Sequence, residues 1–280
     1  MLTKNDLDDY NLDAALAWYV EQGIEGAWLE TPQNRLLPKI VDVPTEALTP
    51  EIQAKPQNIR VTVPPEPLAP IHDSGNALKE ALVSAKEAAD LNALKSAILN
   101  YPHLTIKNTA SQIVFADGNP KADLMVIGDA PNSDDERAGI PFAGEVGDLL
   151  NKMMSAIGRT RGGETAETAF YTTTILKYRP PGNRTPTQFE LDISLPFLKR
   201  HIELIKPKAI LLMGAPAAKL LLGSTETITK LRGKFQTYHM ADGTEIAVMP
   251  SFHPSYLLKS PTQKRASWDD LQALRDRLTL

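Results

Sequence analysis

Short apolar runs alternate with longer amphipathic segments through the second half of the chain. Four runs of five to seven residues have the character of buried strands, at 122–128, 170–176, 208–214 and 246–250. Segments with apolar residues at helical spacing follow them, at 145–157, 187–205, 215–222 and 263–278. Continuous apolar strands separated by helices are typical of a parallel sheet covered on both faces. The pattern predicts an α/β fold with three layers (αβα) and a mainly parallel central sheet.

The first hundred residues follow another pattern. Apolar residues at helical spacing in 1–30 predict a short N-terminal helical segment. Nine of the 22 prolines lie between positions 32 and 70, which excludes regular helix or central strand there and predicts a linker over 31–75. A helix is predicted over 76–99, with a break near Asp90. We therefore expect a helical extension at 1–30, a proline-rich linker at 31–75 and an α/β domain at 76–280.

Composition excludes several classes of protein. With 42% hydrophobic and 23% charged residues, the chain is not disordered throughout. It contains no cysteine, which excludes disulfides, thiolate nucleophiles, cysteine-bound zinc and cysteine-held iron–sulfur clusters. The N-terminus lacks the apolar core of a secretory signal, and the most apolar stretch, 209–223, is too short to span a bilayer. A cytoplasmic protein without membrane contact is expected.

The net charge of −4 conceals an uneven distribution. Residues 151–280 hold 19 Lys and Arg against 11 Asp and Glu, whereas residues 1–150 hold 11 against 23. A basic half can offer a local surface for phosphates in a protein that is acidic overall. The alternative is that these lysines and arginines are scattered over solvated faces.

Polar residues stand where the predicted parallel strands end. Asp129 follows the first strand, a basic loop at 177–184 follows the second, Gly214 follows the third and His253 lies just beyond the fourth. Ligands bind outside the carboxyl ends of the strands in open α/β sheets. A turn carboxylate or a structural histidine would explain each residue alone, but together they predict a site at one sheet edge.

At these residues the chain, from about residue 108 to its end, resembles the uracil-DNA glycosylase superfamily. Within that superfamily it is similar to the bacterial and archaeal group called family 4. The segments that carry the resemblance are Gly128–Asn132, Pro141–Gly144, Lys177–Arg184 and His253–Leu258. Arg232 and the segment 264–271 also fit.

The resemblance implies a DNA glycosylase that hydrolyses the N-glycosidic bond of uracil, or of a related deaminated base, and so starts base excision repair. His253 would stabilise negative charge on the leaving base through its O2 atom. Asp129, which stands where the family has Glu, would position water or offset positive charge on the sugar. The residues expected to contact the base are Ala130, Asn132, Phe142 and Thr174.

The resemblance also implies DNA as the partner, bound by a monomer. The residues expected to contact DNA are Arg179, Arg184, Ser255, Tyr256, Leu257, Lys259, Lys264 and Arg265. Tyr256, Leu257 and Leu258 would lie near the gap that the flipped base leaves. Solvated surface charge for the basic residues, and simple burial for the leucines, are the alternatives.

One departure from the family concerns its [4Fe–4S] cluster. The four cysteines that hold it would fall near Tyr101, Leu104, Tyr178 and Ser194, and none of these is cysteine. We therefore expect no cluster and no other cofactor or metal. Packing by Tyr101, Leu104 and Tyr178 is expected to fill the volume.

A second departure lies in base recognition. The resemblance places Thr174 where the family has an asparagine that reads uracil. A hydroxyl cannot bridge O4 and N3–H as an amide does. Asn132 is an alternative reader of the base. Three functions remain open: a glycosylase, a DNA-binding module of the same fold with little catalysis, and a hydrolase of nucleosides or other small substrates.

Overall fold

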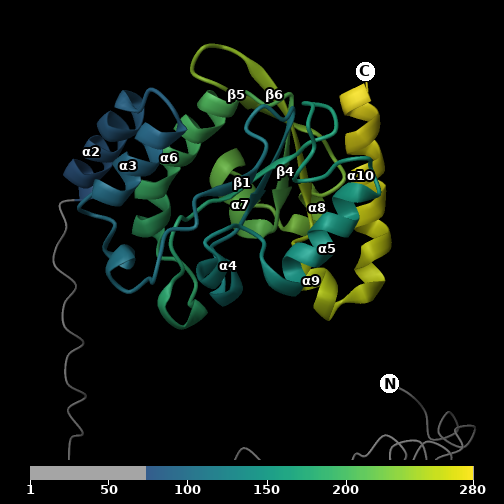
Figure 1. The fold of residues 1–280 in the computed structure, drawn as a ribbon, viewed down its shortest axis with the longest axis horizontal. Coiled ribbons are helices and arrows are strands. Elements are labelled where there is room, and N and C mark those ends of the chain that lie inside the picture. Colours follow the sequence, from purple (N-terminus) through teal and green to yellow (C-terminus); the bar gives the residue numbers. More distant parts are fainter. Residues whose placement is uncertain (1–73, 280) are drawn as a thin grey trace, which may run out of the picture. The chain divides into compact units, whose positions relative to one another are not determined.

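The computed structural model describes residues 74–279, and the predicted helical segment and most of the predicted linker lie outside this range. Its centre is a six-stranded sheet in the order β1-β3-β2-β4-β6-β5 (Figure 1). The strands are β1 (Ala116–Gly118), β2 (Leu124–Gly128), β3 (Tyr171–Thr174), β4 (Ala209–Met213), β5 (Gln236–His239) and β6 (Glu245–Ser251). β3, β2, β4 and β6 are parallel neighbours, which confirms the predicted mainly parallel sheet. The antiparallel edge strands β1 and β5 were not predicted.

Helices fill most of the remaining described chain. They are α2 (Ser74–Glu87), α3 (Leu91–Asn100), α4 (Ser133–Ala138), α5 (Gly144–Ser155), α6 (Gln188–Ile205), α7 (Ala215–Leu222), α8 (Ile228–Leu231), α9 (Pro254–Lys259) and α10 (Lys264–Thr279). Short 3₁₀ turns lie at Thr105–Asn108, Pro181–Asn183 and Pro261–Gln263. Across residues 74–279, no helix combines the length and apolar character that a bilayer crossing requires.

Local chemistry explains where several helices begin. The predicted break in 76–99 separates α2 from α3, because the Asp90 carboxylate accepts the backbone N–H of Ala93 and caps the second helix. At α6, the Thr187 side chain accepts the N–H of Glu190, and the Glu190 carboxylate accepts that of Thr187. This reciprocal pair satisfies two N–H groups that an uncapped helix leaves unpaired.

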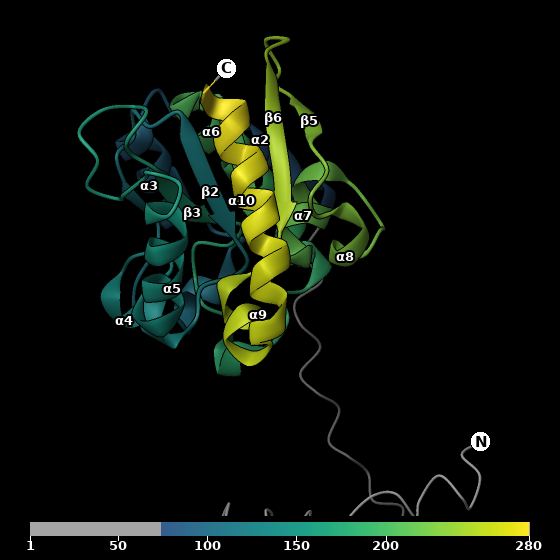
Figure 2. The ribbon, with the colours of Figure 1, turned by 90° about the vertical axis from the view of Figure 1, so that its right-hand side faces the viewer.

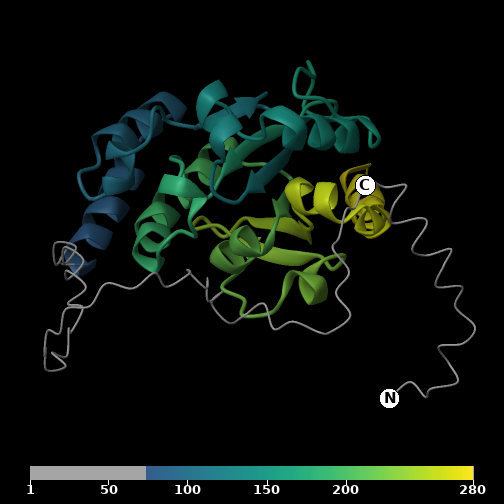
Figure 3. The same ribbon diagram turned by 90° about the horizontal axis from the view of Figure 1, so that it is seen from below.

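Alternate residues of the central strands face two separate apolar clusters. On β2, Met125 and Ile127 pack in one cluster, whereas Leu124 and Val126 pack in the other. The first cluster includes side chains of α2, α3, α6 and α7, and the second includes side chains of α5 and α10. Seen from below, α2 and α3 (blue) and α10 (yellow) lie on opposite sides of the domain (Figure 3). The three-layer αβα prediction is confirmed.

The parallel strands end at one edge of the sheet. In Figure 2 the arrowhead of β6 points down toward α9, and α4 lies along the same lower edge. Asp129 follows β2, Gly214 follows β4 and His253 lies two residues beyond β6. The topology therefore brings these three positions to the same side of the domain.

Candidate active site

A cavity of about 380 Å³ lies at the carboxyl edge of the sheet. It is lined by Asp129, Gly214, Ala215, Ile228, Thr229, Phe252, His253, Ser255 and Tyr256. The residues come from the ends of β2, β4 and β6, from the start of α7, and from α8 and α9. The predicted meeting of Asp129, Gly214 and His253 at one edge is therefore confirmed, whereas the contribution of α8 was not foreseen.

The Asp129 carboxylate is fixed by the helix that follows β4. Its Oδ1 accepts the N–H of Ala217, in the first turn of α7, at 2.9 Å. Gly214 has a φ of 106°, and a Cβ at this position would lie 2.4 Å from Asp129 Oδ2. Only glycine accommodates both constraints. Burial raises the Asp129 pKa to about 7, an effect that the Ala217 hydrogen bond partly offsets.

His253 is held as a neutral imidazole with a defined tautomer. Its Nδ1 accepts the backbone N–H of Ser255 at 3.2 Å and lies 2.8 Å from the Ser255 hydroxyl oxygen. Because a neutral imidazole carries one proton, this arrangement places the proton on Nε2. Burial lowers the His253 pKa to about 4. At neutral pH the residue is therefore an uncharged N–H donor at the cavity wall.

An ion-pair network anchors the end of β6 just before His253. The Ser251 hydroxyl donates to Asp270 Oδ2 at 2.7 Å, and Asp270 pairs with Arg232 at 2.6 Å. The Arg232 guanidinium also lies over the Phe252 ring, 5.4 Å from its centroid. These contacts connect α10 and the residue after α8 to the strand that delivers the histidine. They give Arg232 and the 264–271 segment a positioning role.

Phe142 occupies a strained turn that leads into α5. Its φ is 54°, a region that bulky residues rarely adopt. Arg161 donates to the Phe142 carbonyl at 2.7 Å, and Asp135 accepts the N–H of Ala143 at 2.7 Å. A Cβ on Gly147 would lie 1.9 Å from the Phe142 carbonyl oxygen. Three residues outside the predicted site therefore fix this turn.

The Phe142 ring stacks on His253, with ring centroids 5.5 Å apart and planes 23° from parallel. Phe142 is only 3% exposed and does not line the cavity. A base between two rings requires two van der Waals spacings, roughly 7 Å. Stacking of a base on this face of Phe142 therefore requires the two rings to separate.

Thr174 is buried at the end of β3 and does not line the cavity. Its hydroxyl donates to the Leu176 carbonyl at 2.5 Å, so its hydrogen is committed within the protein. Its carbonyl accepts from Lys177 Nζ at 2.7 Å. Lys177 is itself buried, and burial lowers its pKa to about 7. The hydroxyl retains acceptor capacity only.

The other two predicted base contacts lie at the start of α4. Asn132 Oδ1 accepts hydrogen bonds from the backbone N–H groups of Asp134 and Asp135, at 2.7 and 3.0 Å. The Asp135 carboxylate in turn accepts a hydrogen bond from the backbone N–H of Asn132. The amide oxygen of Asn132 is thus occupied by a capping box. Ala130 is partly buried and packs against the larger apolar cluster.

The predicted DNA-binding arginines are paired within the protein. Arg179 pairs with Glu136 at 3.0 Å, and Arg184 makes two bonds with Glu190, at 2.6 and 2.8 Å. Both arginines therefore hold the loop after β3 in place. A phosphate would have to share or replace these carboxylates.

Helix α9 presents a different set of side chains from the predicted one. Tyr256 and Leu258 are 43% and 39% exposed, whereas Leu257 is 1% exposed. Successive helical positions turn by about 100°, which directs Leu257 inward. This burial favours packing over DNA contact from the exposed face of α9 for Leu257, and Tyr256 and Leu258 are the exposed pair on that face. Further along the chain Lys259, Lys264 and Arg265 are exposed, and Ser255 is partly exposed.

The side chains at the predicted cluster positions do not fit an iron–sulfur cluster. Tyr101, Leu104, Tyr178 and Ser194 are each at most 7% exposed, and the first three belong to one apolar cluster. The Tyr101 hydroxyl donates to the Ala77 carbonyl at 2.5 Å, and its ring meets Phe197 edge-on. None offers a thiolate. The predicted packing of Tyr101, Leu104 and Tyr178 in the core is confirmed.

Within 74–279, no group of three or more His, Asp or Glu side chains is arranged to hold a metal ion. Ser255, which sets the His253 tautomer, was predicted only as a DNA contact. Arg161 and Asp135 were not singled out, because their roles depend on carbonyl and N–H groups that the fold brings near them. The Pro-Phe-Ala-Gly segment was the one sequence signal for that turn.

Comparison with known proteins agrees with this geometry. Residues 115–272 match the Uracil DNA glycosylase superfamily. The type-4 uracil-DNA glycosylase of Sulfurisphaera tokodaii is 30% identical over 191 residues, covering 66% of this chain and 84% of that protein. That of Saccharolobus solfataricus is 34% identical over 170 residues, covering 59% of this chain and 76% of that protein. That of Pyrobaculum aerophilum is 30% identical over 186 residues, covering 65% of this chain and 91% of that protein. The chain therefore belongs to the uracil-DNA glycosylase superfamily and is type-4-like within it.

Proposed function

We propose that this protein is a DNA glycosylase that hydrolyses the N-glycosidic bond of uracil, or of a related deaminated base, in DNA. The observation that carries the proposal is the pairing in one cavity of a partly buried carboxylate, Asp129, with a neutral histidine whose free nitrogen is a donor. The relatives named type-4 uracil-DNA glycosylases support the same activity. The product is an abasic site, the starting point of base excision repair.

His253 is the residue that stabilises the leaving base. Breaking the bond between C1′ and N1 leaves negative charge on the base, which is shared by its O2 atom. A preorganised N–H donor in a site of low dielectric stabilises such charge strongly. The Nε2–H of neutral His253 supplies this donor, and the imidazole does not need to be protonated first.

Asp129 acts on the sugar side of the bond. An ionised carboxylate offsets positive charge that develops at C1′, and it accepts a proton as water adds there. Its pKa of about 7 means that about half of the molecules carry the ionised form at neutral pH. The side chain is one methylene shorter than the family Glu, and the Ala217 N–H holds it in place.

Base recognition is proposed for Phe142, Thr174 and Ala130. Flipping the nucleotide out of the duplex costs a few kcal/mol, which stacking and edge contacts repay. Phe142 supplies the stacking face once it separates from His253, and the Thr174 hydroxyl accepts from the base N3–H. The capping role of Asn132 makes it a positioning residue for α4.

The proposed DNA contacts are Ser255, Tyr256, Lys259, Lys264 and Arg265, with Leu258 in place of Leu257. Arg179 and Arg184 order the neighbouring loop. They contact phosphates through the guanidinium N–H groups that their ion pairs do not use. We propose further that the protein is a cytoplasmic monomer without a cofactor, with the α/β domain at 76–280 joined by a 31–75 linker to the 1–30 segment.

The experiment that tests the proposal is base release from defined oligonucleotides. Purified protein is incubated with single- and double-stranded DNA containing one uracil, hypoxanthine, xanthine or thymine, and the abasic product is cleaved by alkali. We expect uracil release above that from thymine. Stoichiometric DNA binding without release of any base would contradict the enzyme and support a DNA-binding module.

A further inference from the structure

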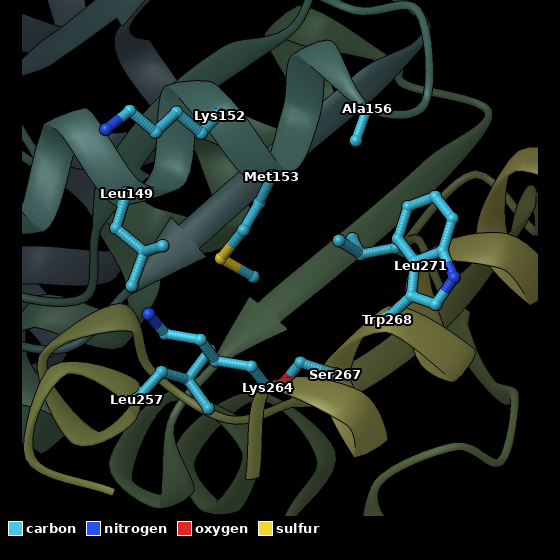
Figure 4. A pocket seen from close by; sticks show the side chains of 9 residues that line it. All are labelled: Leu149, Lys152, Met153, Ala156, Leu257, Lys264, Ser267, Trp268 and Leu271. Atoms are coloured by element: carbon cyan, nitrogen blue, oxygen red, sulfur yellow. The ribbon is translucent and has the colours of Figure 1, made fainter. Parts of the chain in front are cut away.

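The proposed reaction leaves unused a groove on the opposite side of α9 from the cavity. It has a volume of about 230 Å³ and lies between α5, α9 and α10 (Figure 4). Its apolar lining is Leu149, Met153, Ala156, Leu257, Trp268 and Leu271, and its polar lining is Lys152, Lys264 and Ser267. The combination of an aromatic face, a thioether and the Lys264 ammonium group suits a flat, apolar group attached to an anion.

Figure 4 shows how the side chains are distributed along this groove. The Trp268 indole lies at one end, the Lys264 ammonium lies at the other near Leu149 and Leu257, and the Met153 thioether extends between them. Lys152 and Lys264 are exposed, whereas Met153 and Trp268 are only partly covered. An aromatic ring and a sulfur atom are therefore accessible beside a mobile positive charge.

The groove and the proposed active site share structural elements. Leu257 lies in the groove, and its N–H donates to the carbonyl of His253 at 3.2 Å, one turn earlier on the chain. Helix α5 supplies Met153 to the groove and begins two residues after Phe142. The six residues of α9 span about 9 Å, so the groove and the cavity, which both receive side chains from α9, are close enough for neighbouring nucleotides of one strand.

We propose that this groove binds an unpaired nucleobase of the DNA substrate, a few nucleotides from the uracil. The base stacks on Trp268 beside Met153, and Lys264 neutralises a phosphate that flanks it. This inference rests on the proposed function, because it assigns a second subsite for the same DNA. Base–aromatic stacking tolerates any sequence, so the subsite adds affinity without reading sequence.

The dimensions of the groove favour a base over a peptide. Drug-sized ligands occupy pockets of roughly 300–1,000 Å³, and an amphipathic helix needs a groove with several anchor positions. About 230 Å³ accommodates one flat ring system. The Lys264 ammonium matches a phosphate, and α9 contributes residues both to the groove (Leu257) and to the cavity (Ser255 and Tyr256).

A matched pair of variants tests the subsite. Ala156 lines the groove, whereas the adjacent and equally exposed Ser155 lines a different cavity with Asn151 and Phe170. Ala156→Glu and Ser155→Glu therefore add the same charge at the end of the same helix, but only the first fills the groove mouth. Both are made in the full chain with Trp18→Phe and Trp28→Phe, so that Trp268 is the one tryptophan.

The probe is a single-stranded oligonucleotide with one 2′-fluorodeoxyuridine, in which fluorine beside C1′ slows hydrolysis. A series of such probes lacks the base at one position after another around the uridine. We expect saturable quenching of Trp268 fluorescence in the parent and in Ser155→Glu, and its loss in Ala156→Glu. Removing the base at one position should weaken binding about tenfold in Ser155→Glu and have no effect in Ala156→Glu.

The outcomes distinguish this inference from the proposed function. Normal uracil release and DNA binding, with no quenching or with quenching that persists in Ala156→Glu, would overturn the subsite alone. Binding that is insensitive to every base removal would also overturn it. Absence of both DNA binding and uracil release would overturn the proposed function, and the subsite with it.

Discussion

At the scale of single residues, one physical cause shifts two pKa values in opposite directions. Burial disfavours the charged form of either group, and so it raises the Asp129 pKa to about 7 and lowers the His253 pKa to about 4. Across the pH range 5 to 9 His253 keeps its neutral form while Asp129 titrates. The proposed mechanism therefore assigns a rate that rises with pH in this range to Asp129, and the Asp129→Asn variant separates this effect from the titration of Lys177, whose pKa burial lowers to about 7.

The rate of uracil release should rise with pH to a plateau above about 7. Below that value the fraction of ionised Asp129 falls about tenfold per pH unit, and the rate should fall with it. The measurement is a single-turnover rate at saturating protein between pH 5 and 9, with Asp129→Asn as the control, which should be slow and independent of pH. A wild-type rate that falls as the pH rises would mean that Asp129 acts as an acid.

Thr174→Asn should raise uracil release about tenfold or more. The Thr174 hydroxyl donates to Leu176, whereas an amide offers both a donor and an acceptor, a pairing worth about 1–3 kcal/mol of base recognition. The control is Thr174→Val, which removes the hydroxyl and adds no amide, and should show no gain. A pocket rebuilt for another base would instead lose activity on that base when the asparagine is introduced.

At the scale of elements, the turn before α5 determines whether Phe142 is in place. Gly147→Ala should reduce uracil release at least tenfold, because its Cβ cannot fit 1.9 Å from the Phe142 carbonyl and the strained turn must move. Gly162→Ala is the control, since no atom lies within 4 Å of its added Cβ.

Circular dichroism and thermal melting should show that both glycine variants remain folded. Equal activity of the two folded variants would show that the position of Phe142 does not limit the reaction.

Elements with a strong periodic pattern were predictable, whereas those fixed by neighbours were not. The apolar runs that became β2 and β4 and the amphipathic pattern of α10 carry their own signal. β1 and β5 are short edge strands with few apolar residues; β1 pairs with β3, which lies far along the chain, and β5 pairs with the next strand, β6. Sequence likewise indicated Asp129 and His253 but not the inward direction of Leu257, which depends on where α9 begins.

At the scale of the whole molecule, the basic half of the chain provides the proposed DNA surface. Lys259, Lys264 and Arg265 lie at and beyond the end of α9 and are exposed, with Arg265 3.8 Å from the exposed Asp269 carboxylate, whereas Arg179 and Arg184 make closer pairs with the buried residues Glu136 and Glu190. Each lysine or arginine that contacts a phosphate contributes about 0.7–0.9 to the slope of log affinity against log salt. The exposed residues should therefore account for more of the slope than the paired arginines.

Replacing Lys259 and Lys264 with alanine should lower the salt slope of DNA binding by about 1 to 2. Lys199→Ala is the control, because this exposed lysine lies on α6, on the other face of the sheet. The slope is measured by fluorescence anisotropy of a labelled oligonucleotide at salt concentrations between roughly 50 and 300 mM. An unchanged slope in the double variant would mean that Lys259 and Lys264 do not contact DNA phosphates.

The most direct test of the account compares uracil release by the wild type and by His253→Ala. Both proteins are incubated in excess over an oligonucleotide with a single uracil, and strand cleavage at the abasic product is followed with time. We expect release by the wild type and a loss of at least about a hundredfold in His253→Ala, because a donor to developing negative charge is removed. Equal release by the two proteins would contradict the assignment of the active site.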